Sequence, residues 1–292
     1  MGVGDWFGTF SGNLTISTEK RSSISNRYQL ITRRLNLDFY NLDSNTSHSF
    51  YGGSYGRGTA ISGFSDLDML FVLPYSVYKQ YNEHVGNGQS ALLQAFRNSM
   101  RKTYSSSDVG ADGQIVSVTF TDGITFEVLP CFLSDKDSYI YPDSNDGGKW
   151  RVTDPKPEIA AIANGDQSWN GNLKPLCRMI RAWKNKWNVP MGGLLIDTLA
   201  HRFLGNWDNR DKSFLYYDWM SRDFFDFLSK EDDTKAHWYA VGSNQYIHGK
   251  GNFSFKAKQC YNIALEAIEK EKDYPYTAKS KWREIYGTQY PS

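Results

Sequence analysis

The sequence predicts an α+β fold in which a first half of mixed strands and helices precedes a second half made of helices. Hydrophobic segments of strand length lie before Pro130, whereas apolar residues recur at helical spacing after residue 172. The 292 residues are enough for one two-lobed body or for about two domains. Apolar residues make up 40% of the chain and aromatic residues 15%, which is typical of a folded globular protein.

The first half contains a long helix, a buried strand, a second helix and a hairpin, in that order. Apolar residues at helical spacing predict helices over residues 18–36 and 90–104. The segment DLDMLFVLP, which ends at Pro74, predicts a buried strand. Two apolar segments flank the turn Thr121-Asp122-Gly123 and predict a β-hairpin over residues 115–130.

After the hairpin we expect a loop-like crossing and then a helical lobe. Residues 135–157 are dense in Asp, Gly, Pro and Ser, a composition typical of a connection between lobes. Apolar spacing then predicts helices over residues 172–188, 193–205, 217–229, 254–271 and 277–286. We therefore expect two domains, which span residues 1–150 and 151–292.

The composition argues against several classes of protein. The chain has 33 Lys and Arg against 32 Asp and Glu, so its net charge of +1 provides no overall field for a nucleic acid or a membrane surface. Cys131, Cys177 and Cys260 lie in apolar segments without CxxC spacing, which predicts reduced, buried thiols. There is no secretory signal pattern and no long apolar run, so we expect a cytoplasmic protein without a membrane partner.

The histidines and two aromatic segments carry no recognisable functional motif. No HExxH motif, paired-ligand spacing or GxSxG elbow occurs, so neither a zinc site nor a hydrolase is expected. The histidines in question are His48, His84, His201, His237 and His248. The aromatic residues of DWMSRDFFDF and YAVGSNQY are expected in the core rather than on a base-stacking surface.

Three acidic residues form the first candidate site. Asp66 and Asp68 begin the predicted buried strand two residues apart, so both carboxylates face the same side. Neighbouring carboxylates repel each other, and Mg²⁺, which prefers oxygen ligands, relieves that repulsion. Glu127 is a lone acid in the apolar segment FEVLP, where burial is costly unless the group is paired or metal-bound, and it is a natural third ligand. The alternative for the aspartates is a solvated pair at the start of a strand.

Gly53 and Ser54 form the second candidate, in the glycine-rich segment YGGSYGRGT. Ser54 lies 12 residues before Asp66, and small residues there allow backbone N–H groups and a hydroxyl to approach phosphate closely. The segment is neither a P-loop nor a dinucleotide-binding fingerprint. A glycine-rich surface turn is the alternative.

A Gly-Ser turn, an Asp-x-Asp strand and an acid on a neighbouring strand resemble the polymerase-β-like nucleotidyltransferases. Five segments are together similar to the bacterial cGAS/DncV-like nucleotidyltransferases, or CD-NTases, over about residues 6–287: GSYGRGTAISGFSDLDMLFVLP, FEVLPCF, WRVTDPKPE, RMIRAWKNKW and KWREIYG. The three-acid motif alone also fits oligoadenylate synthases, poly(A) polymerases and CCA-adding enzymes, and the helical half narrows the choice. The resemblance implies a polymerase-β-like core, with a mixed sheet and a long N-terminal helix, and a helical lobe that closes over a nucleotide cleft.

The resemblance also implies roles for these residues. Asp66 and Asp68 would bind two Mg²⁺ ions, with Mn²⁺ as a substitute, and Glu127 would bind the ion that activates the attacking hydroxyl. Glu127 stands where the family usually has Asp, and its extra methylene alters the reach of the carboxylate. Gly53 and Ser54 would hold the donor triphosphate.

Three further residues complete the nucleotide site that the resemblance implies. Arg181 occupies the lysine position of the family's R-x-x-K-x-W pattern, which keeps the charge but replaces a point charge by a planar fork. Lys184 follows three residues later on the same helix face, where a solvated basic face is the alternative. Asn164 lies where family members contact a base edge, and a helix C-cap is the alternative. Gly192 and Gly193 stand where eukaryotic relatives have a hydroxyl residue and a base-stacking Tyr.

The activity that the resemblance implies is Mg²⁺-dependent synthesis of a cyclic dinucleotide or small cyclic oligonucleotide from NTPs, with release of pyrophosphate, in bacterial antiphage (CBASS-type) signalling. The partners would be the NTP substrates and a separate effector protein that the product activates. A near-neutral charge argues against a stable nucleic-acid partner. The alternatives are a nucleotidyltransferase that makes a linear oligonucleotide or modifies RNA or protein, and a catalytically silent nucleotide-binding protein.

Overall fold

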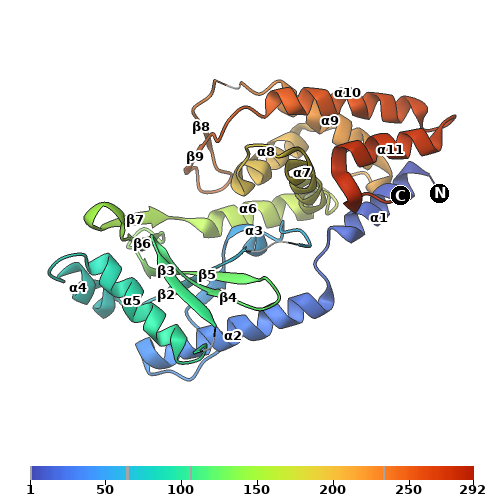
Figure 1. The fold of residues 1–292 in the computed structure, drawn as a ribbon. Helices are drawn as coiled ribbons and strands as arrows, with labels where there is room; N and C mark the ends of the chain where they lie inside the picture. The colour runs from blue at the N-terminus through green and yellow to red at the C-terminus, as the bar shows by residue number, and fades with distance from the viewer. Residues whose placement is uncertain (1, 64–65, 106, 233) are drawn as a thin grey trace. The chain divides into compact units, whose positions relative to one another are not determined.

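The structure, a computed structural model, describes residues 2–63, 66–105, 107–232 and 234–292. Phe64 and Ser65 of the glycine-rich motif therefore lie outside the described residues. The chain forms two compact units, each drawn in Figure 1. We call them the sheet unit, Ser17–Gly56 with Gly63–Pro155, and the helical unit, which comprises Met1–Ile16, Arg57–Ser62 and Lys156–Ser292.

These units differ from the continuous domains 1–150 and 151–292 that we expected, because two early segments pack with the C-terminal helices. Helix α1 (Val3–Asn13) contributes Phe7, whose ring centroid lies 4.9 Å from that of Trp282 in α11 (Pro275–Tyr286). In the segment Arg57–Ser62, Thr59 donates a hydrogen bond to Asp197. Contacts over such sequence distances leave no local pattern from which a boundary could be predicted.

The sheet unit is built on a mixed sheet in the order β1-β2-β5-β4-β3, with β6 paired to β5 and β7 paired to β6. β2 and β5 run parallel, whereas the other pairs are antiparallel. The strands are β1 (Ser49–Tyr51), β2 (Asp66–Val72), β3 (Asp108–Asp112), β4 (Ile115–Thr119), β5 (Thr125–Leu133), β6 (Tyr139–Asp143) and β7 (Lys149–Thr153). The helices of this unit are α2 (Thr18–Tyr40), α3 (Gly53–Gly56), α4 (Tyr75–Asn82) and α5 (Gly88–Arg101). The mixed sheet with a long preceding helix confirms the predicted fold class.

One face of this sheet is covered by helices and forms the core. Every second residue of β2 is buried, and the same alternation holds along β4 and the first part of β5. These side chains pack against apolar residues of α2 and α5, and Figure 1 shows both helices beside the sheet. Alternation sends the intervening residues of the same strands to the other face, which is where the predicted carboxylates lie.

The helical unit contains a second apolar core, formed by its long helices. Helix α7 buries one side along most of its length, including Ile180 and Trp183. Helix α6 (Pro155–Ser168) starts at the last residue of the sheet unit. Besides α1, α6 and α11, the elements are α7 (Leu173–Trp187), α8 (Gly193–Asn206), η2 (Phe214–Tyr216), α9 (Tyr217–Ser229), β8 (His237–Tyr239), β9 (Tyr246–His248), α10 (Ser254–Lys270) and η3 (Gly287–Gln289). The five helices predicted for this part of the chain are confirmed to within two residues at each end.

The expectation of a loop over residues 135–157 is wrong. This segment contains β6, a short 3₁₀ turn and β7, and α6 begins at Pro155. β7 has no buried residue and β6 contains Pro142, so neither strand shows the apolar alternation on which a sequence-based prediction depends. Strands at the margin of a sheet tolerate such residues because part of their backbone faces away from the ladder.

The predicted state of the cysteines is confirmed: Cys131, Cys177 and Cys260 are free thiols, and all of them are buried. Burial raises the pKa of the Cys260 thiol to about 12. Among the residues that the structure describes, no helix combines the length and the apolar character needed to cross a membrane.

Candidate active site

The parallel pairing of β2 with β5 brings the predicted acids together. Asp68 is directly opposite Glu127, and Asp66 is opposite Thr125. Paired residues of adjacent strands point to the same face of a sheet, so the carboxylates of both strands share one face. That face is the polar one, because Leu67 and Phe126 point into the core on the other side.

The electrostatics of Glu127 show how near the other two acids are. Burial raises the pKa of Glu127 above its usual value, and the negative charges of Asp68 and Asp66 raise it further. An unpaired carboxylate at this position is therefore destabilised by its surroundings. A positive charge placed among the acids would remove that penalty.

The backbone of Gly53 lies against the carboxylate of Asp68. Gly53 has φ +51°, and a Cβ added there would lie 1.6 Å from Oδ2 of Asp68. The backbone N–H of Gly52 donates to the carbonyl oxygen of Asp68 at 2.9 Å, and that of Gly56 donates to Gly52 O at 2.7 Å. The α3 turn, which also carries Ser54, is thus tied directly to the acid-bearing strand, and only glycine fits at position 53.

The chemistry of this donor set fits Mg²⁺, which the fold implies for the site. All three side chains offer carboxylate oxygens, the hard donors that Mg²⁺ selects. The Gly53 backbone leaves room beside Asp68 that any larger residue would fill. In the part of the chain that the structure describes, no three His, Cys, Asp or Glu side chains already lie close enough together to hold a metal ion.

The remaining predicted residues lie in the helical unit, where Arg181 has a different environment from the one expected. Arg181 is 7% exposed. Its guanidinium donates to both carboxylate oxygens of Asp197, at 2.5 and 2.9 Å, and to the carbonyl oxygen of Gly193 at 3.1 Å. A Cβ on Gly193 would lie 3.1 Å from the guanidinium, so the glycine allows this close approach. Arg181 therefore sits inside the packing of α7 against α8, and a direct grip on a triphosphate stays a prediction that this burial does not favour.

Asp197 is the centre of a buried ion-pair network that the sequence analysis missed. Besides Arg181, it accepts hydrogen bonds from Arg57 Nε at 2.8 Å and from the Thr59 hydroxyl at 2.9 Å. Burial raises the pKa of Asp197, but the two arginines outweigh burial and hold the pKa at about 2. The signal was present in the sequence, because Asp197 is a lone acid in the apolar segment LLIDTLA, the same kind of signal that identified Glu127.

Lys184 lies one turn beyond Arg181 and is half-buried. Burial lowers the pKa of Lys184, and the charges of Arg181 and Lys250 lower it further. Two positive charges thus act on Lys184, an arrangement that an anion would stabilise. Asn164 is exposed within α6, which continues to Ser168, so the alternative of a helix C-cap is wrong.

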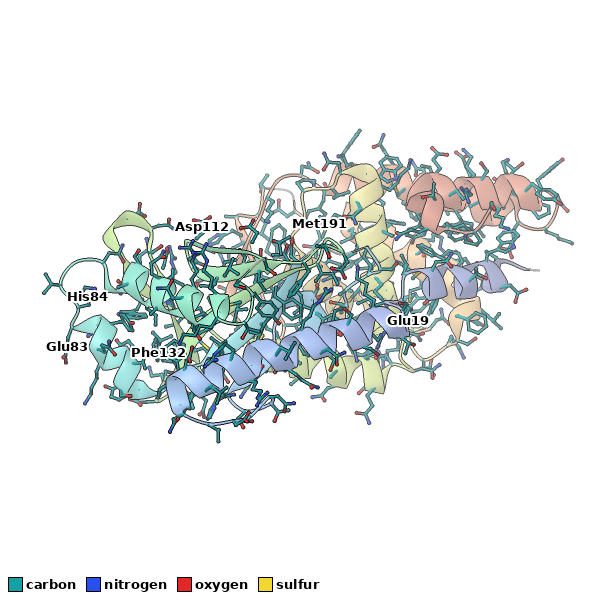
Figure 2. All side chains as sticks on the ribbon, turned by 60° about the horizontal axis from the view of Figure 1, so that its bottom comes forward. Glu19, Glu83, His84, Asp112, Phe132 and Met191 are labelled. Atoms are coloured by element: carbon teal, nitrogen blue, oxygen red, sulfur yellow. The ribbon has the colours of Figure 1, made fainter. Side chains whose placement is uncertain are left out.

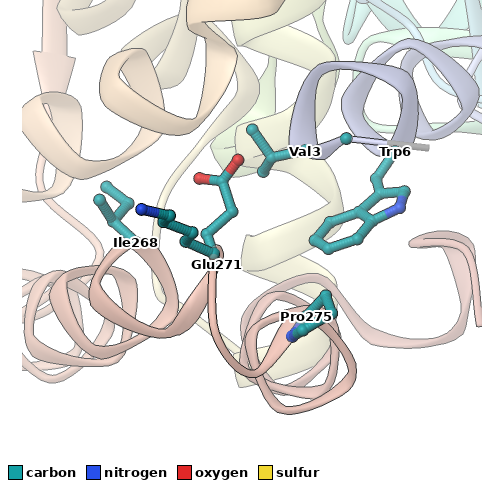
Figure 3. Close-up of a pocket in the computed structure, with 7 residues that line it drawn as sticks. Val3, Trp6, Ile268, Glu271 and Pro275 are labelled. Atoms are coloured by element: carbon teal, nitrogen blue, oxygen red, sulfur yellow. The ribbon is translucent and has the colours of Figure 1, made fainter.

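A cavity of about 330 Å³ lies elsewhere in the helical unit, between the start of α1 and the turn that joins α10 to α11 (Figure 3). Val3, Trp6, Ile268 and Pro275 give it apolar walls, and the carboxylate of Glu271 points towards the start of α1. None of the predicted site residues lines it.

Several proteins of known fold resemble this chain. The structure of Vibrio cholerae DncV in its apo form has a TM-score of 0.73 at 12% identity, over 100% of this chain and 96% of that one. The complex of Escherichia coli MS115-1 CdnC with HORMA-deltaN gives 0.69 at 14% identity, over 99% of this chain and 98% of that one. At these identities the likeness shows that the fold is that of the DncV-like nucleotidyltransferases, as the sequence analysis expected.

Sequence comparison adds the family. A probable cyclic nucleotide synthase of Bacillus cereus (strain VD146) is 22% identical over 185 residues, which are 57% of this chain and 52% of the relative. The chain thus spans about half the length of this curated relative. The model of the Second Messenger Oligonucleotide or Dinucleotide Synthetase domain, SMODS, matches residues 1–165. This match covers more than half of the 292 residues, and the chain therefore belongs to the SMODS family.

Proposed function

We propose that this protein is a Mg²⁺-dependent nucleotidyltransferase that joins NTPs into a cyclic dinucleotide or small cyclic oligonucleotide and releases pyrophosphate. The observation that carries the proposal is the register of β2 and β5, which places Asp68 opposite Glu127 with Asp66 on the same face, beside the Gly53 backbone. Membership of the SMODS family supports this reaction rather than another use of the same fold.

In this proposal Asp66, Asp68 and Glu127 hold two divalent cations. These ions supply charge neutralisation for the attacking and leaving oxygens of an in-line displacement at the α-phosphorus. The chain's own contribution is to fix the three carboxylates on adjacent strands, so that little reorganisation is needed when the substrate binds. The raised pKa of Glu127 is consistent with a group whose charged form needs a cation beside it.

We assign four further residues to the nucleotide. Gly53 and Ser54 approach the donor triphosphate through backbone N–H groups and a hydroxyl, next to the carboxylates. Lys184 contributes its charge to the triphosphate, and Asn164 contacts a base edge. Arg181 acts on Lys184 through its charge and fixes the start of α8 through Gly193 and Asp197. We therefore assign it a positioning role in place of the predicted direct contact with the triphosphate.

The biological setting that we propose is bacterial antiphage signalling of the CBASS type, in the cytoplasm. The product would activate a separate effector protein, and no stable nucleic-acid partner is required. Two similar structures support NTPs as substrates: E. coli MS115-1 CdnC contains ATP, and Vibrio cholerae DncV cyclic AMP-GMP synthase contains the linear intermediate 5′ pppA(3′,5′)pG.

The test is to incubate the purified protein with all four NTPs and Mg²⁺ or Mn²⁺, treat the mixture with phosphatase, and identify the surviving products by mass spectrometry. The double variant Asp66→Asn, Asp68→Asn is compared with Asp135→Asn, which changes an exposed acid in another part of the sheet unit. A phosphatase-resistant cyclic product from the wild type and from Asp135→Asn, but not from the double variant, would establish the proposal and identify the bases.

Other outcomes select an alternative. Linear oligonucleotides would indicate an oligoadenylate-type enzyme, and NTP binding without pyrophosphate release would indicate a silent nucleotide-binding protein. Full activity of the double variant would show that the carboxylates have been assigned wrongly.

A further inference from the structure

The hairpin of β8 and β9 brings two histidines together that are 11 residues apart in the sequence. The strands pair antiparallel, with His237 opposite His248, Trp238 opposite Ile247 and Tyr239 opposite Tyr246. Alternation along a strand places the histidine pair and the tyrosine pair on one face, and Trp238 with Ile247 on the other.

The face that carries the histidines is open to solvent. Trp238 is 2% exposed and belongs to the core of the helical unit, so it anchors the hairpin from the opposite face. Tyr239 and Tyr246 are 47% and 62% exposed, and His248 is also exposed. The expectation that the aromatic residues of YAVGSNQY lie in the core is therefore wrong for these two tyrosines, because that expectation considered composition and not the two faces of a hairpin.

The hydrogen bonds of the hairpin determine how close the two histidines come. Ala240 N–H donates to Gln245 O at 2.8 Å, and Gly249 N–H donates to Ala236 O at 3.3 Å. Hydrogen-bonded and non-hydrogen-bonded pairs alternate along an antiparallel ladder, so His237 and His248 form a non-hydrogen-bonded pair. Side chains approach most closely at such pairs, where the Cα atoms are about 4.5 Å apart.

The two imidazoles are also available to a ligand. Neither side chain makes a hydrogen bond or an ion pair with another of the described residues. The ring of His237 packs edge-on against Tyr246, with ring centroids 4.5 Å apart, and against Tyr239 at 5.4 Å. These contacts limit the motion of His237 while its nitrogens remain without protein partners.

We propose that His237 and His248 together bind one late first-row divalent metal ion, for which Zn²⁺ is the probe. Neutral imidazole is a preferred ligand of Zn²⁺, and two imidazoles that face each other across a ladder can both reach one ion at about 2.0–2.1 Å. Zn²⁺ takes four ligands, so two positions remain for water or for donors from another molecule. The carboxylates of the candidate active site offer only oxygen, which Mg²⁺ prefers, whereas a pair of imidazoles favours late first-row metals.

The test is isothermal titration of ZnCl₂ into the full chain, in a non-coordinating buffer with saturating Mg²⁺. We compare His237→Ala and His248→Ala with His84→Ala, an exposed histidine that Figure 2 shows next to Glu83 in the segment between α4 and α5. The wild type and His84→Ala should bind one Zn²⁺ per chain. Each hairpin variant should bind about tenfold more weakly or worse, because it loses the second imidazole.

Two controls make the result decisive. The double variant Asp66→Asn, Asp68→Asn must retain the Zn²⁺ site, and the hairpin variants must keep the melting temperature of the metal-free wild type. Electron paramagnetic resonance with Cu²⁺ as the probe should report two nitrogen ligands in the wild type and one in either hairpin variant. Wild-type affinity in His248→Ala or His237→Ala, or loss of the site in the aspartate double variant, would overturn the proposal.

Discussion

Replacement of Gly53 by alanine tests the link between the α3 turn and the carboxylates that we propose as metal ligands. The added Cβ would lie 1.6 Å from Oδ2, 2.4 Å from Cγ and 3.0 Å from Cβ of Asp68. The carboxylate would have to retreat by about 1.8 Å before Oδ2 reaches an ordinary contact of 3.4 Å. The substitution thus moves one predicted metal ligand without removing it.

The expected effect follows from that displacement. A misplacement of about 1 Å in a reacting assembly costs about 100-fold in rate, so Gly53→Ala should lower kcat for pyrophosphate release by at least that factor. The alanine must also adopt φ +51°, which costs about 1–2 kcal/mol of stability. The two effects need separate controls.

Gly123 provides the matched control. It lies in the β4–β5 turn of the same unit with φ +81°, and nothing lies within 4 Å of the Cβ that alanine would add. Gly123→Ala should therefore lose similar stability in urea unfolding and keep its kcat. The reasoning is refuted if Gly53→Ala retains wild-type kcat, or if Gly123→Ala loses activity to the same degree while both remain folded at the assay temperature.

Three further predictions concern single side chains. Asp66→Asn and Asp68→Asn should each lower kcat by about 10²–10³-fold with the fold intact, because each removes charge stabilisation of the transition state. Steady-state kinetics measures kcat, and circular dichroism checks the fold. A small effect of either change on kcat would contradict the metal assignment. Asp197→Asn should lower the free energy of unfolding by about 3–5 kcal/mol, since it removes the counter-charge of the buried Arg181 and leaves Arg57 only the more distant carboxylate of Glu158, at 3.7 Å. Because the pKa of Asp197 is held at about 2, below an unfolded value of about 3.9, its contribution is complete above about pH 4 and is lost as the pH falls towards 2. Urea unfolding at several pH values should therefore show the wild type and Asp197→Asn converging in acid, and a constant difference would contradict the assignment. Lys184→Ala should raise the KM for NTPs about tenfold, and Lys184→Arg should raise it less because the charge is kept. An unchanged KM in Lys184→Ala would show that Lys184 is a solvated basic residue without a role in NTP binding.

Much of the fold could be predicted because its main helices and strands carry strong local patterns. The helices α7, α8, α9 and α10 each present a regular apolar face, and their predicted bounds agree closely with the structure. Helix α1 was not predicted, because VGDWFGTFSGN contains three glycines and its N-cap residue, Gly2, has no side chain that could mark the start of a helix. β6 and β7 were missed because exposure and a proline remove the alternation that marks a strand.

The candidate site divides in the same way. Asp66, Asp68 and Glu127 could be predicted, since two residues of spacing in a strand and a lone acid in an apolar strand are local signals. Arg181 shares a helix face with Lys184 in sequence terms, but its long side chain turns inward to Asp197, a partner on another helix. No spacing rule could predict that contact.

The histidine pair shows the same limit. His237 and His248 have no motif spacing, and they become neighbours only because a hairpin turn places them at opposite positions.

The aromatic contacts between the two ends of the helical unit have a consequence for synthesis of the chain. Phe7 and Phe10 pack on Trp282 and Tyr286, which leave the ribosome about 275 residues later. At roughly 5–20 residues per second, the first helix waits about 15–55 s for these partners. The sheet unit ends at Pro155 and is complete well before then. During this interval the apolar side of α1 lacks its C-terminal partners, so slower synthesis of the chain should increase its aggregation.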